Sequence, residues 1–456
     1  MRAKKGLFVG IVLILILGFI GMFLRDQKLS TQLKAGEEIT FFVASDIHYL
    51  ANSLKDRGDA FKKYVSLADD GRELEYIDEI MKAFTYDIEK KKPDILLISG
   101  DLTNNGEKES HLELKRLLDK IEDLGTSVYV IPGNHDILNP WAIGFKQDQR
   151  YETETIDAKE FKKIYKNFGY KEAISWDKTT LSYLATPSED MWLLMLDTNQ
   201  YKDNMKKGSP VADGVIGPKT LNWIKKCNDL AKKNGAQIIT VMHHNLLDHN
   251  EIIHEGYTLD NQEESLAVFE EEGLNVFLSG HIHIQDISSY RPVNKGKITQ
   301  GNNLIYDIVT SSLNVYPQQY GILQYSPTKN TYDYSTSWVD VEGWSTQEGL
   351  LDENINHFRE YSAKSFGKEA YYMAYLALIG LNRYTKEELD IMSRTMEILN
   401  VRYFSGKDQE GEEEILKSKG FALWQSAPDS FVKKYIISIL KDQNTDDNSL
   451  HIEMDF

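Results

Sequence analysis

The sequence predicts an α/β fold in which short buried strands alternate with amphipathic helices. Short apolar, β-branched runs recur through residues 40–280, and stretches with helical periodicity separate several of them. Five of these runs end directly in Asp, Asn or His side chains. In open α/β sheets, ligands bind outside the carboxyl ends of the strands. The pattern therefore indicates a functional site at one edge of a sheet rather than a set of surface turns.

Metal-binding side chains follow these five runs in a definite order. The five segments are Asp46-Ile47-His48, Gly100-Asp101, Gly133-Asn134-His135-Asp136, His243-His244-Asn245 and Gly280-His281-Ile282-His283. They contain six of the eleven histidines of the chain, which favours a metal site over scattered structural histidines. No role in the site is assigned to His111, His249, His254, His357 or His451.

Together the five segments resemble the motifs of the calcineurin-like metallophosphoesterases, over about residues 40–340. The stretch 100–107, Gly-Asp-Leu-Thr-Asn-Asn-Gly-Glu, is most similar to the bacterial class III cyclic-nucleotide phosphodiesterases. The resemblance implies an α+β sandwich of two packed mixed β-sheets flanked by helices, within a domain spanning 38–342. Residues 304–340 are rich in Tyr, Thr and Ser and predict antiparallel strands, which the resemblance places in the second sheet.

The resemblance further implies a dinuclear metal site in which Asp101 bridges the two ions. The first metal would be bound by Asp46, His48, Asp101 and His283. The second metal would be bound by Asp101, Asn134, His243 and His281. Nitrogen and oxygen donors without sulfur suit two divalent ions of Mn, Fe, Zn or Co.

Other residues near the metals receive roles in substrate binding and catalysis from the same resemblance. Asn134 and His135 would contact the phosphate, and His135 would protonate the leaving oxygen. Asp136 would orient the imidazole of His135. His244 is expected to lie beside the ligands or the substrate, with simple loop packing as the alternative. Asn104 is a weaker candidate for the site, because it could instead cap the following helix.

These features predict a metal-dependent phosphodiesterase that acts on nucleotides, cyclic ones included. One alternative is a phosphatase or phosphodiesterase acting on cell-envelope polymers or phospholipid headgroups. A second alternative is a non-enzymatic, membrane-tethered scaffold, but a vestigial site should lack ligands and none is missing here. The formal charge of −18 argues against duplex nucleic acid as a partner, although a metal pair still permits a small anionic substrate. The sequence does not indicate an oligomeric state.

The first 28 residues predict a membrane anchor. Residues 6–24 carry no charge, and nineteen residues of helix rise about 28 Å, close to the thickness of the bilayer core. Arg2, Lys4 and Lys5 precede the run, which favours an orientation with the catalytic domain outside the cytoplasm. The alternative is a cleaved signal peptide and secretion of the remaining chain.

Insertions and a C-terminal region surround the predicted catalytic domain. Residues 49–71 and 137–180 would lie near the site, where Trp141 or Phe145 could stack on a base or simply pack their loop. Residues 345–456 predict a separate helical domain that packs beside the site, and the acidic tail from 442 onward is expected to be frayed. The single cysteine, Cys227, lies in a helical pattern and is expected to be a buried or half-buried thiol.

Overall fold

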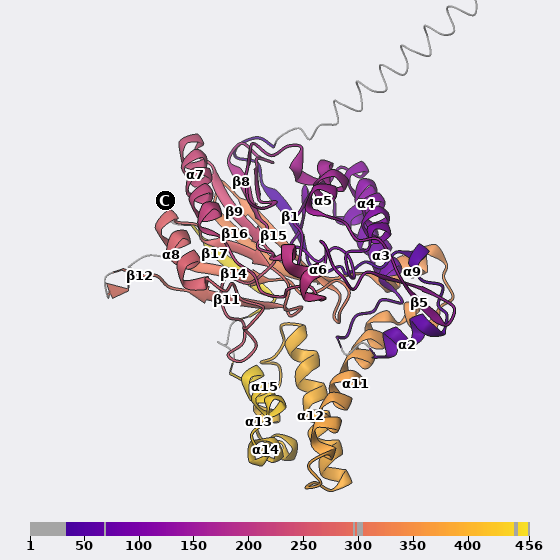
Figure 1. Cartoon of the computed structure of the whole chain (residues 1–456). Helices are drawn as coiled ribbons and strands as arrows, with labels where there is room; N and C mark the ends of the chain where they lie inside the picture. The colour runs from indigo at the N-terminus through magenta and orange to yellow at the C-terminus, as the bar shows by residue number, and fades with distance from the viewer. Residues whose placement is uncertain (1–32, 68–69, 295–296, 299–303, 442–445, 455–456) are drawn as a thin grey trace, which may run out of the picture.

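Two mixed β-sheets lie face to face at the centre of the protein, and helices cover their outer faces (Figure 1). The computed structural model describes residues 33–67, 70–294, 297–298, 304–441 and 446–454. One continuous hydrophobic core joins the facing sides of the two sheets. The two packed sheets agree with the predicted fold class.

The first sheet combines a parallel half with an antiparallel half. Its order is β17 (Ser449–Glu453), β16 (Thr331–Trp338), β15 (Gln319–Ser326), β1 (Ile39–Ala44), β2 (Ile95–Ile98) and β3 (Ser127–Val130). Strands β1, β2 and β3 are parallel, and β15 runs antiparallel to β1. The carboxyl ends of the three parallel strands therefore meet at one edge of the sheet.

The second sheet has four parallel central strands. Its order is β11 (Asp286–Tyr290), β14 (Ile305–Val309), β10 (Val276–Ser279), β9 (Gln237–Met242), β8 (Met191–Leu196), β7 (Tyr183–Ala185) and β6 (Ser175–Trp176). Residues 304–340 are expected from the sequence to lie together in one sheet, and this prediction is wrong. Strand β14 joins the second sheet, whereas β15 and β16 join the first. Strand β14 is parallel to β10, whereas β15 and β16 form a hairpin that pairs with β1.

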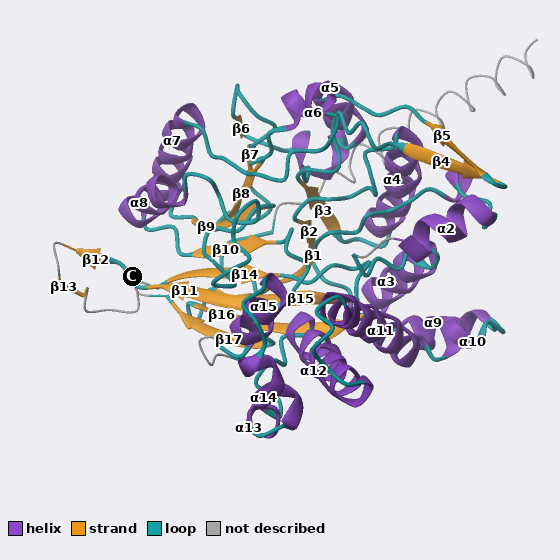
Figure 2. Cartoon of the chain, turned by 60° about the horizontal axis from the view of Figure 1, so that its bottom comes forward, coloured by secondary structure: helices purple, strands orange, loops and turns teal. Residues whose placement is uncertain are grey.

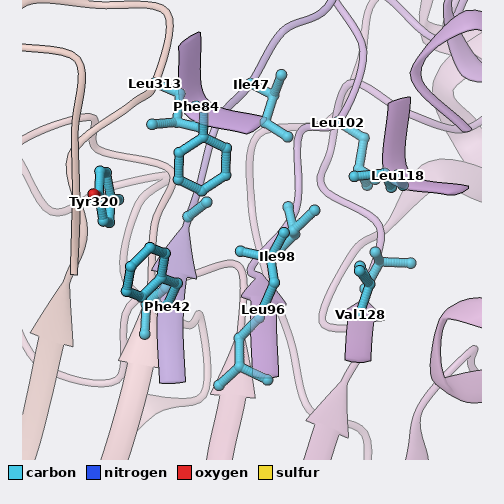
Figure 3. Packing of buried hydrophobic residues seen from close by; sticks show 14 of the residues in the cluster. Phe42, Ile47, Phe84, Leu96, Ile98, Leu102, Leu118, Val128, Leu313 and Tyr320 are labelled. Atoms are coloured by element: carbon cyan, nitrogen blue, oxygen red, sulfur yellow. The ribbon is translucent and has the colours of Figure 1, made fainter. Parts of the chain in front are cut away.

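Helices that connect the parallel strands cover both outer faces, as Figure 2 shows. The first sheet is covered by α3 (Ile77–Lys91) and α4 (Lys108–Asp123), and the second by α7 (Pro218–Asn234) and α8 (Gln262–Glu272). Phe84 of α3 and Leu118 of α4 lie over Phe42 and Val128 of the first sheet (Figure 3). Cys227 of α7 is buried, as expected, against the second sheet.

The two insertions form small elements rather than bare loops. Residues 49–71 contain η1 (Asn52–Leu54) and α2 (Asp59–Leu67), and Phe61 of α2 packs edge-on against Phe145. Phe145 is buried, so it packs its own loop, whereas the side chain of Trp141 is 48% exposed. The remaining short elements are β4 (Ile143–Lys146), β5 (Gln149–Glu152), α5 (Ala158–Ile164), η2 (Lys166–Tyr170), η3 (Tyr201–Asp203), α6 (Asn204–Lys207), β12 (Val293–Asn294) and β13 (Lys297–Ile298).

The C-terminal region is helical and packs on the loop that follows β10. Its helices are α9 (Val341–Glu348), α10 (Glu353–Asn356), α11 (Phe358–Ile379), α12 (Lys386–Phe404), α13 (Glu412–Leu416), α14 (Lys419–Ser426) and α15 (Phe431–Ile439). Met392 and Trp424 belong to a hydrophobic cluster that also includes Ile282 and Ile284. These two isoleucines flank His283, so the helical region supports a segment of the predicted site.

The tail of the chain departs from the prediction of a helical segment with a frayed end. Residues 449–453 form β17, which pairs with β16 at the edge of the first sheet. Leu450 and Ile452 alternate with polar residues, and Ile452 is buried opposite Tyr332. This alternation has the period of a strand with one buried face, so these residues form a strand instead of a frayed end.

The predicted membrane anchor at residues 1–28 lies outside the described residues. Within the part of the chain that the structure describes, none of the helices combines the length and apolar character needed to span a bilayer.

Candidate metal centre

Five loops that leave the carboxyl ends of parallel strands converge on one site. Three of them follow β1, β2 and β3 of the first sheet, and two follow β9 and β10 of the second. Backbone hydrogen bonds fix the loops to one another: the N–H of His48 donates to the carbonyl of Asp101 at 2.9 Å, and the N–H of Gly280 donates to that of His243 at 3.1 Å. The site therefore lies where the ends of the two sheets meet.

Five of the predicted metal ligands have a left-handed backbone conformation. Their φ angles are 51° at Asp46, 45° at His48, 47° at Asp101, 72° at His281 and 65° at His283. This region is costly for residues with a Cβ, and such residues persist only where surrounding structure holds them. Their concentration in these loops indicates that the fold imposes the orientation of the ligand side chains.

Two glycines permit the close approach of the loops. A Cβ on Gly133 would overlap the backbone nitrogen and Oδ1 of Asp101. A Cβ on Gly280 would overlap Oγ of Ser45 and approach the carboxylate of Asp46. Glycine at these positions lets one loop lie directly on the ligand carried by another.

Asp46, His48 and His283 form the first group of candidate ligands. One ligand atom from each residue lies within 4.8 Å of the others. The two Nε2 atoms of His48 and His283 are 3.0 Å apart, and Oδ1 of Asp46 lies 3.4 Å from Nε2 of His283. Oδ1 of Asp46 is buried and has no hydrogen-bond partner among the described residues. A buried carboxylate oxygen without a partner is costly, and a bound cation would satisfy it.

Asp101, His243 and His281 form the second group, with the same spacing between ligand atoms. Asn134 joins this group, since its Oδ1 lies 3.0 Å from Nε2 of His243. Every ligand predicted for the second metal is therefore present at one place. The donors are nitrogen and oxygen atoms, which fits a divalent transition metal.

The carboxylate of Asp101 lies between the two groups. Its Oδ2 is 3.7 Å from Nε2 of His48 in the first group and 3.6 Å from Nε2 of His243 in the second. Burial and the neighbouring carboxylates of Asp46 and Asp136 raise the pKa of Asp101 well above its usual range. Cations on both sides would remove this repulsion, so the position suits a bridging ligand.

Hydrogen bonds to backbone carbonyls orient two of the ligand histidines. The Nδ1–H of His243 donates to the carbonyl of Ser99 at 2.9 Å, and the Nε2–H of His281 donates to that of Gly256 at 2.7 Å. Nε2 of His243 and Nδ1 of His281 are then left as lone-pair donors for a metal. Burial lowers the pKa of both rings, that of His281 to about 3, so both are neutral as a metal ligand must be.

The predicted proton donor, His135, lies beside the first group. Its ring centroid is 5.1 Å from that of His48 in an edge-to-face arrangement. Its Nδ1–H donates to the carbonyl of Asn104 at 3.0 Å, with Oδ1 of Asn105 at 3.1 Å from the same nitrogen. Burial and the positive charge of Arg72 lower the pKa of His135 to about 3. Nε2 is the ring nitrogen available to a substrate.

The prediction that Asp136 orients His135 is wrong. The buried carboxylate of Asp136 accepts hydrogen bonds from the N–H groups of Leu102, Thr103 and Gly133 at 3.1, 2.9 and 2.8 Å. It also accepts one from the Thr103 hydroxyl at 2.8 Å. These bonds turn the carboxylate away from the imidazole, so that Asp136 ties two ligand loops together. The carbonyl of Asn104 orients His135 instead.

His244 packs its loop and does not present a ring nitrogen to substrate. Its Nδ1 accepts a hydrogen bond from the Thr198 hydroxyl at 2.7 Å, and its Nε2–H donates to the carbonyl of Ala212 at 2.8 Å. The ring is fully buried, and burial holds its pKa well below the usual range. The ring lies beside the ligand histidines His243 and His281, with centroids 5.2 and 4.6 Å away, so its expected position beside the ligands is confirmed and the predicted substrate contact is wrong.

Sequence reasoning missed Arg72, and of the two alternatives left open for Asn104 the capping role is wrong. Helix α4 has Glu107 at its N-cap position, so Asn104 does not cap it. Oδ1 of Asn104 instead accepts a hydrogen bond from Nη1 of Arg72 at 3.0 Å. Arg72 follows an insertion of mixed charge, and its sequence context contains no signal that separates it from surface residues.

His249, to which the sequence assigns no role in the site, lies in a buried ionic cluster beneath it. Its Nδ1 makes a very short contact with Oδ2 of Asp286, and its Nε2 lies 3.2 Å from Oδ2 of Asp307. Asp307 also accepts hydrogen bonds from the N–H groups of Leu246 and Leu247, at 2.6 and 2.9 Å. Burial alone would lower the pKa of His249, but the two aspartates raise it to about 10. The cluster supports the loop that carries His243.

Comparison with known proteins identifies the family. Residues 39–285 match the family model for calcineurin-like phosphoesterase, and residues 340–446 match the C-terminal domain of cyclic nucleotide phosphodiesterase. The first match covers more than half of the chain, so the protein belongs to the calcineurin-like phosphoesterase family, and the predicted resemblance is confirmed. It is a metal-dependent phosphoester hydrolase. A search of curated proteins found no match.

The matches among solved structures are distant in sequence and have TM-scores below 0.5. A dimetal phosphatase from Danio rerio is 10% identical, with 65% of this chain and 95% of that chain covered and a TM-score of 0.43. GAP50, the anchor in the inner membrane complex of Plasmodium, is 11% identical, with coverage of 66% and 85% and a TM-score of 0.33. A putative 5′-nucleotidase from Staphylococcus aureus is 13% identical, with coverage of 72% and 58% and a TM-score of 0.37.

Replacement of the bridging ligand should affect both metal positions. We expect Asp101→Asn to lower the occupancy of both, because Oδ2 of Asp101 lies between the two groups. His48→Ala should chiefly weaken the first position. Metal per chain, measured by plasma mass spectrometry after dialysis, distinguishes the two results. His357→Ala, at an exposed histidine, is the control and should keep the wild-type metal content. Equal losses in the Asp101 and His48 variants would contradict the bridging role.

The His249 cluster should make stability fall as the pH rises. The pKa of His249 is raised from 6.5 to about 10 on folding, so the folded state holds a proton that the unfolded state has lost between these values. The stabilisation is complete below about pH 6.5 and disappears as the pH approaches 10. Urea unfolding across this range should show a flatter pH profile for His249→Gln than for wild type or His357→Gln. Parallel profiles for all three proteins would exclude this role for His249.

Proposed function

We propose that the protein is a phosphodiesterase that hydrolyses nucleotide substrates, cyclic nucleotides included. The observation that carries this proposal is the packing of the C-terminal helices on Ile282 and Ile284, beside the candidate ligand His283. These helices lie in the region that matches the C-terminal domain of cyclic nucleotide phosphodiesterase. Because these helices pack on the loop that carries His283, we expect them to shape the part of the site that receives the leaving group of the substrate.

The side chains of the site divide the tasks of phosphoester hydrolysis. Two divalent metals held by the two ligand groups would supply an acidified water and charge neutralisation at phosphorus. His135 faces the same place with Nε2, and its Nδ1–H is held by Asn104. In the neutral ring the proton is on Nδ1, so Nε2 carries a proton only when the ring is a positively charged imidazolium. The negative charge of a bound phosphoester is therefore needed to raise the pKa of His135. Substrate binding would in this way prepare the proton for the leaving oxygen.

Trp141 supports a substrate that contains a base. Its ring centroid is 6.4 Å from that of His135, and the side chain is 48% exposed. The indole N–H donates to the carbonyl of Gly208 at 3.1 Å, which fixes the edge of the ring. An indole fixed at its edge with exposed surface offers a stacking platform for any nucleobase.

The N-terminal sequence favours a second candidate function, on cell-envelope polymers or phospholipid headgroups. The charge-free residues 6–24 support a membrane anchor, and an enzyme anchored on the outer side meets these substrates first. We propose this topology, with secretion after signal cleavage as its alternative.

Protease added to intact cells should then digest the catalytic domain, and protection until lysis would reverse the orientation. Mn, Fe, Zn and Co remain the proposed metals.

A substrate panel with wild-type and His135→Ala enzyme tests the proposed function. With Mn²⁺ present, wild type should hydrolyse 2′,3′- or 3′,5′-cyclic nucleotides better than phospholipid headgroup esters or envelope polymers. His135→Ala should lose about 10²–10⁴-fold in kcat on nucleotides, the usual contribution of a general acid. The loss on bis-p-nitrophenyl phosphate should be much smaller, because p-nitrophenolate leaves without a proton. Metal content should stay at the wild-type level, since His135 is not a candidate ligand.

Two outcomes would contradict these expectations separately. A wild-type enzyme that prefers headgroup esters or envelope polymers would replace the nucleotide proposal with the second candidate. An equal loss on both leaving groups in His135→Ala would mean that His135 positions the substrate or stabilises charge, and its role as an acid would be wrong.

A further inference from the structure

We propose that Arg72 binds a non-bridging oxygen of the phosphoryl group through its guanidinium, which Asp70 and Asn104 hold in place. The inference rests on the proposed function and adds a substrate-binding residue outside the five motif segments. Arg72 immediately follows the first insertion and precedes α3. Phosphate recognition by arginine uses paired N–H donors that match the geometry of two oxygens.

The backbone of Arg72 is fixed to the segment that also supports the first metal group. Arg72 forms a β-bridge with Val315, and the next N–H, of Glu73, donates to the carbonyl of Asn314 at 2.8 Å. The side chain of Asn314 donates to the carbonyl of His48 at 3.2 Å. One short segment therefore fixes both the arginine and a ligand loop, which sets the arginine at a constant position relative to the metal site.

The guanidinium is held but retains donors for a ligand. Its Nε–H donates to Oδ2 of Asp70 at 2.8 Å, Nη2 lies 2.5 Å from the same oxygen, and Nη1 donates to Oδ1 of Asn104 at 3.0 Å. A guanidinium has five N–H donors. Within the described part of the chain, these contacts use one hydrogen on each nitrogen. Nη1 and Nη2 each keep a second N–H that can bind an oxygen.

Asn104 places the guanidinium beside the reacting groups. Its side chain accepts the bond from Arg72, while its backbone carbonyl accepts the Nδ1–H of His135. After burial, the charge of Arg72 is the largest influence that lowers the pKa of His48 and of His135, which agrees with its proximity to both. A phosphoryl group between the metals and His135 would thus lie near a fixed positive charge.

A purely structural ion pair accounts poorly for this arrangement. The side chain of Arg72 is only 9% exposed, whereas that of its partner Asp70 is 39% exposed. Burial of a guanidinium costs free energy, and an ion pair with a carboxylate that is itself partly exposed offsets only part of that cost. A cation kept in a buried position at such a cost is better explained by an anionic ligand that it binds there.

The test combines phosphate binding with turnover in three variants. Arg72→Gln should lose about 10²-fold in kcat/KM on bis-p-nitrophenyl phosphate, the usual effect of removing one donor to developing charge. Inorganic phosphate should bind the metal-loaded variant at least about tenfold more weakly by calorimetry, with metal content unchanged. Arg72→Lys should be intermediate, and added guanidinium should partly restore the activity of Arg72→Ala.

Arg57→Gln provides the matched control. Arg57 lies in the insertion that precedes Arg72, is half exposed and pairs with Glu79, so its replacement should leave turnover and phosphate binding unchanged. Wild-type phosphate affinity in Arg72→Gln would overturn the proposal even if no phosphodiester in the panel proves to be a substrate. Loss of turnover with unchanged phosphate affinity and no rescue by guanidinium would also overturn it, since these results indicate a structural role.

Discussion

The contact between loops from two different sheets is the constraint on which the site depends. Asp46 and Asp101 leave the first sheet, while His243, His281 and His283 leave the second, so neither sheet alone carries a complete ligand group. Gly133 and Gly280 allow the loops to lie against each other, and left-handed conformations at the ligands turn the side chains inward. The free energy of packing the two sheets therefore holds the ligands in place, and loosening of the sandwich would open both metal positions together.

The positions of the motifs at the ends of strands predicted which side chains lie together in the candidate ligand groups, while their division between two metals came from the resemblance to the family. A residue shortly after a parallel strand lies near the carboxyl edge whatever its side chain does, and Asp46, Asp101 and His243 all lie within three residues of the end of such a strand. The direction of a side chain is a different matter. Asp136 lies in the Gly133-Asn134-His135-Asp136 motif, yet its carboxylate turns to three backbone N–H groups, and only the packed loops determine that choice.

Residues brought to the site by long-range pairing could not be predicted in the same way. Arg72 reaches its position through a bridge to Val315, and no periodicity or motif near residue 72 encodes that partner. His249 likewise becomes part of the support beneath the site only because β11 and β14 place Asp286 and Asp307 on both sides of its ring. The same limit applies to β17. Its alternating pattern is short, and it predicts a strand only when the edge of β16 is known to be there for pairing.

The electrostatics of the site then determine what it can bind. The carboxylates of Asp46, Asp101 and Asp136 are buried close together, and burial with mutual repulsion holds the pKa of Asp101 well above its usual range. The neighbouring ligand rings of His243 and His281 are neutral, so they do not offset this negative charge. Divalent cations would therefore stabilise the folded state as well as activate water, which couples metal binding to folding. With divalent ions neutralising the carboxylates, a phosphoester could approach, and Arg72 and His135 are nearby groups that could respond to its charge.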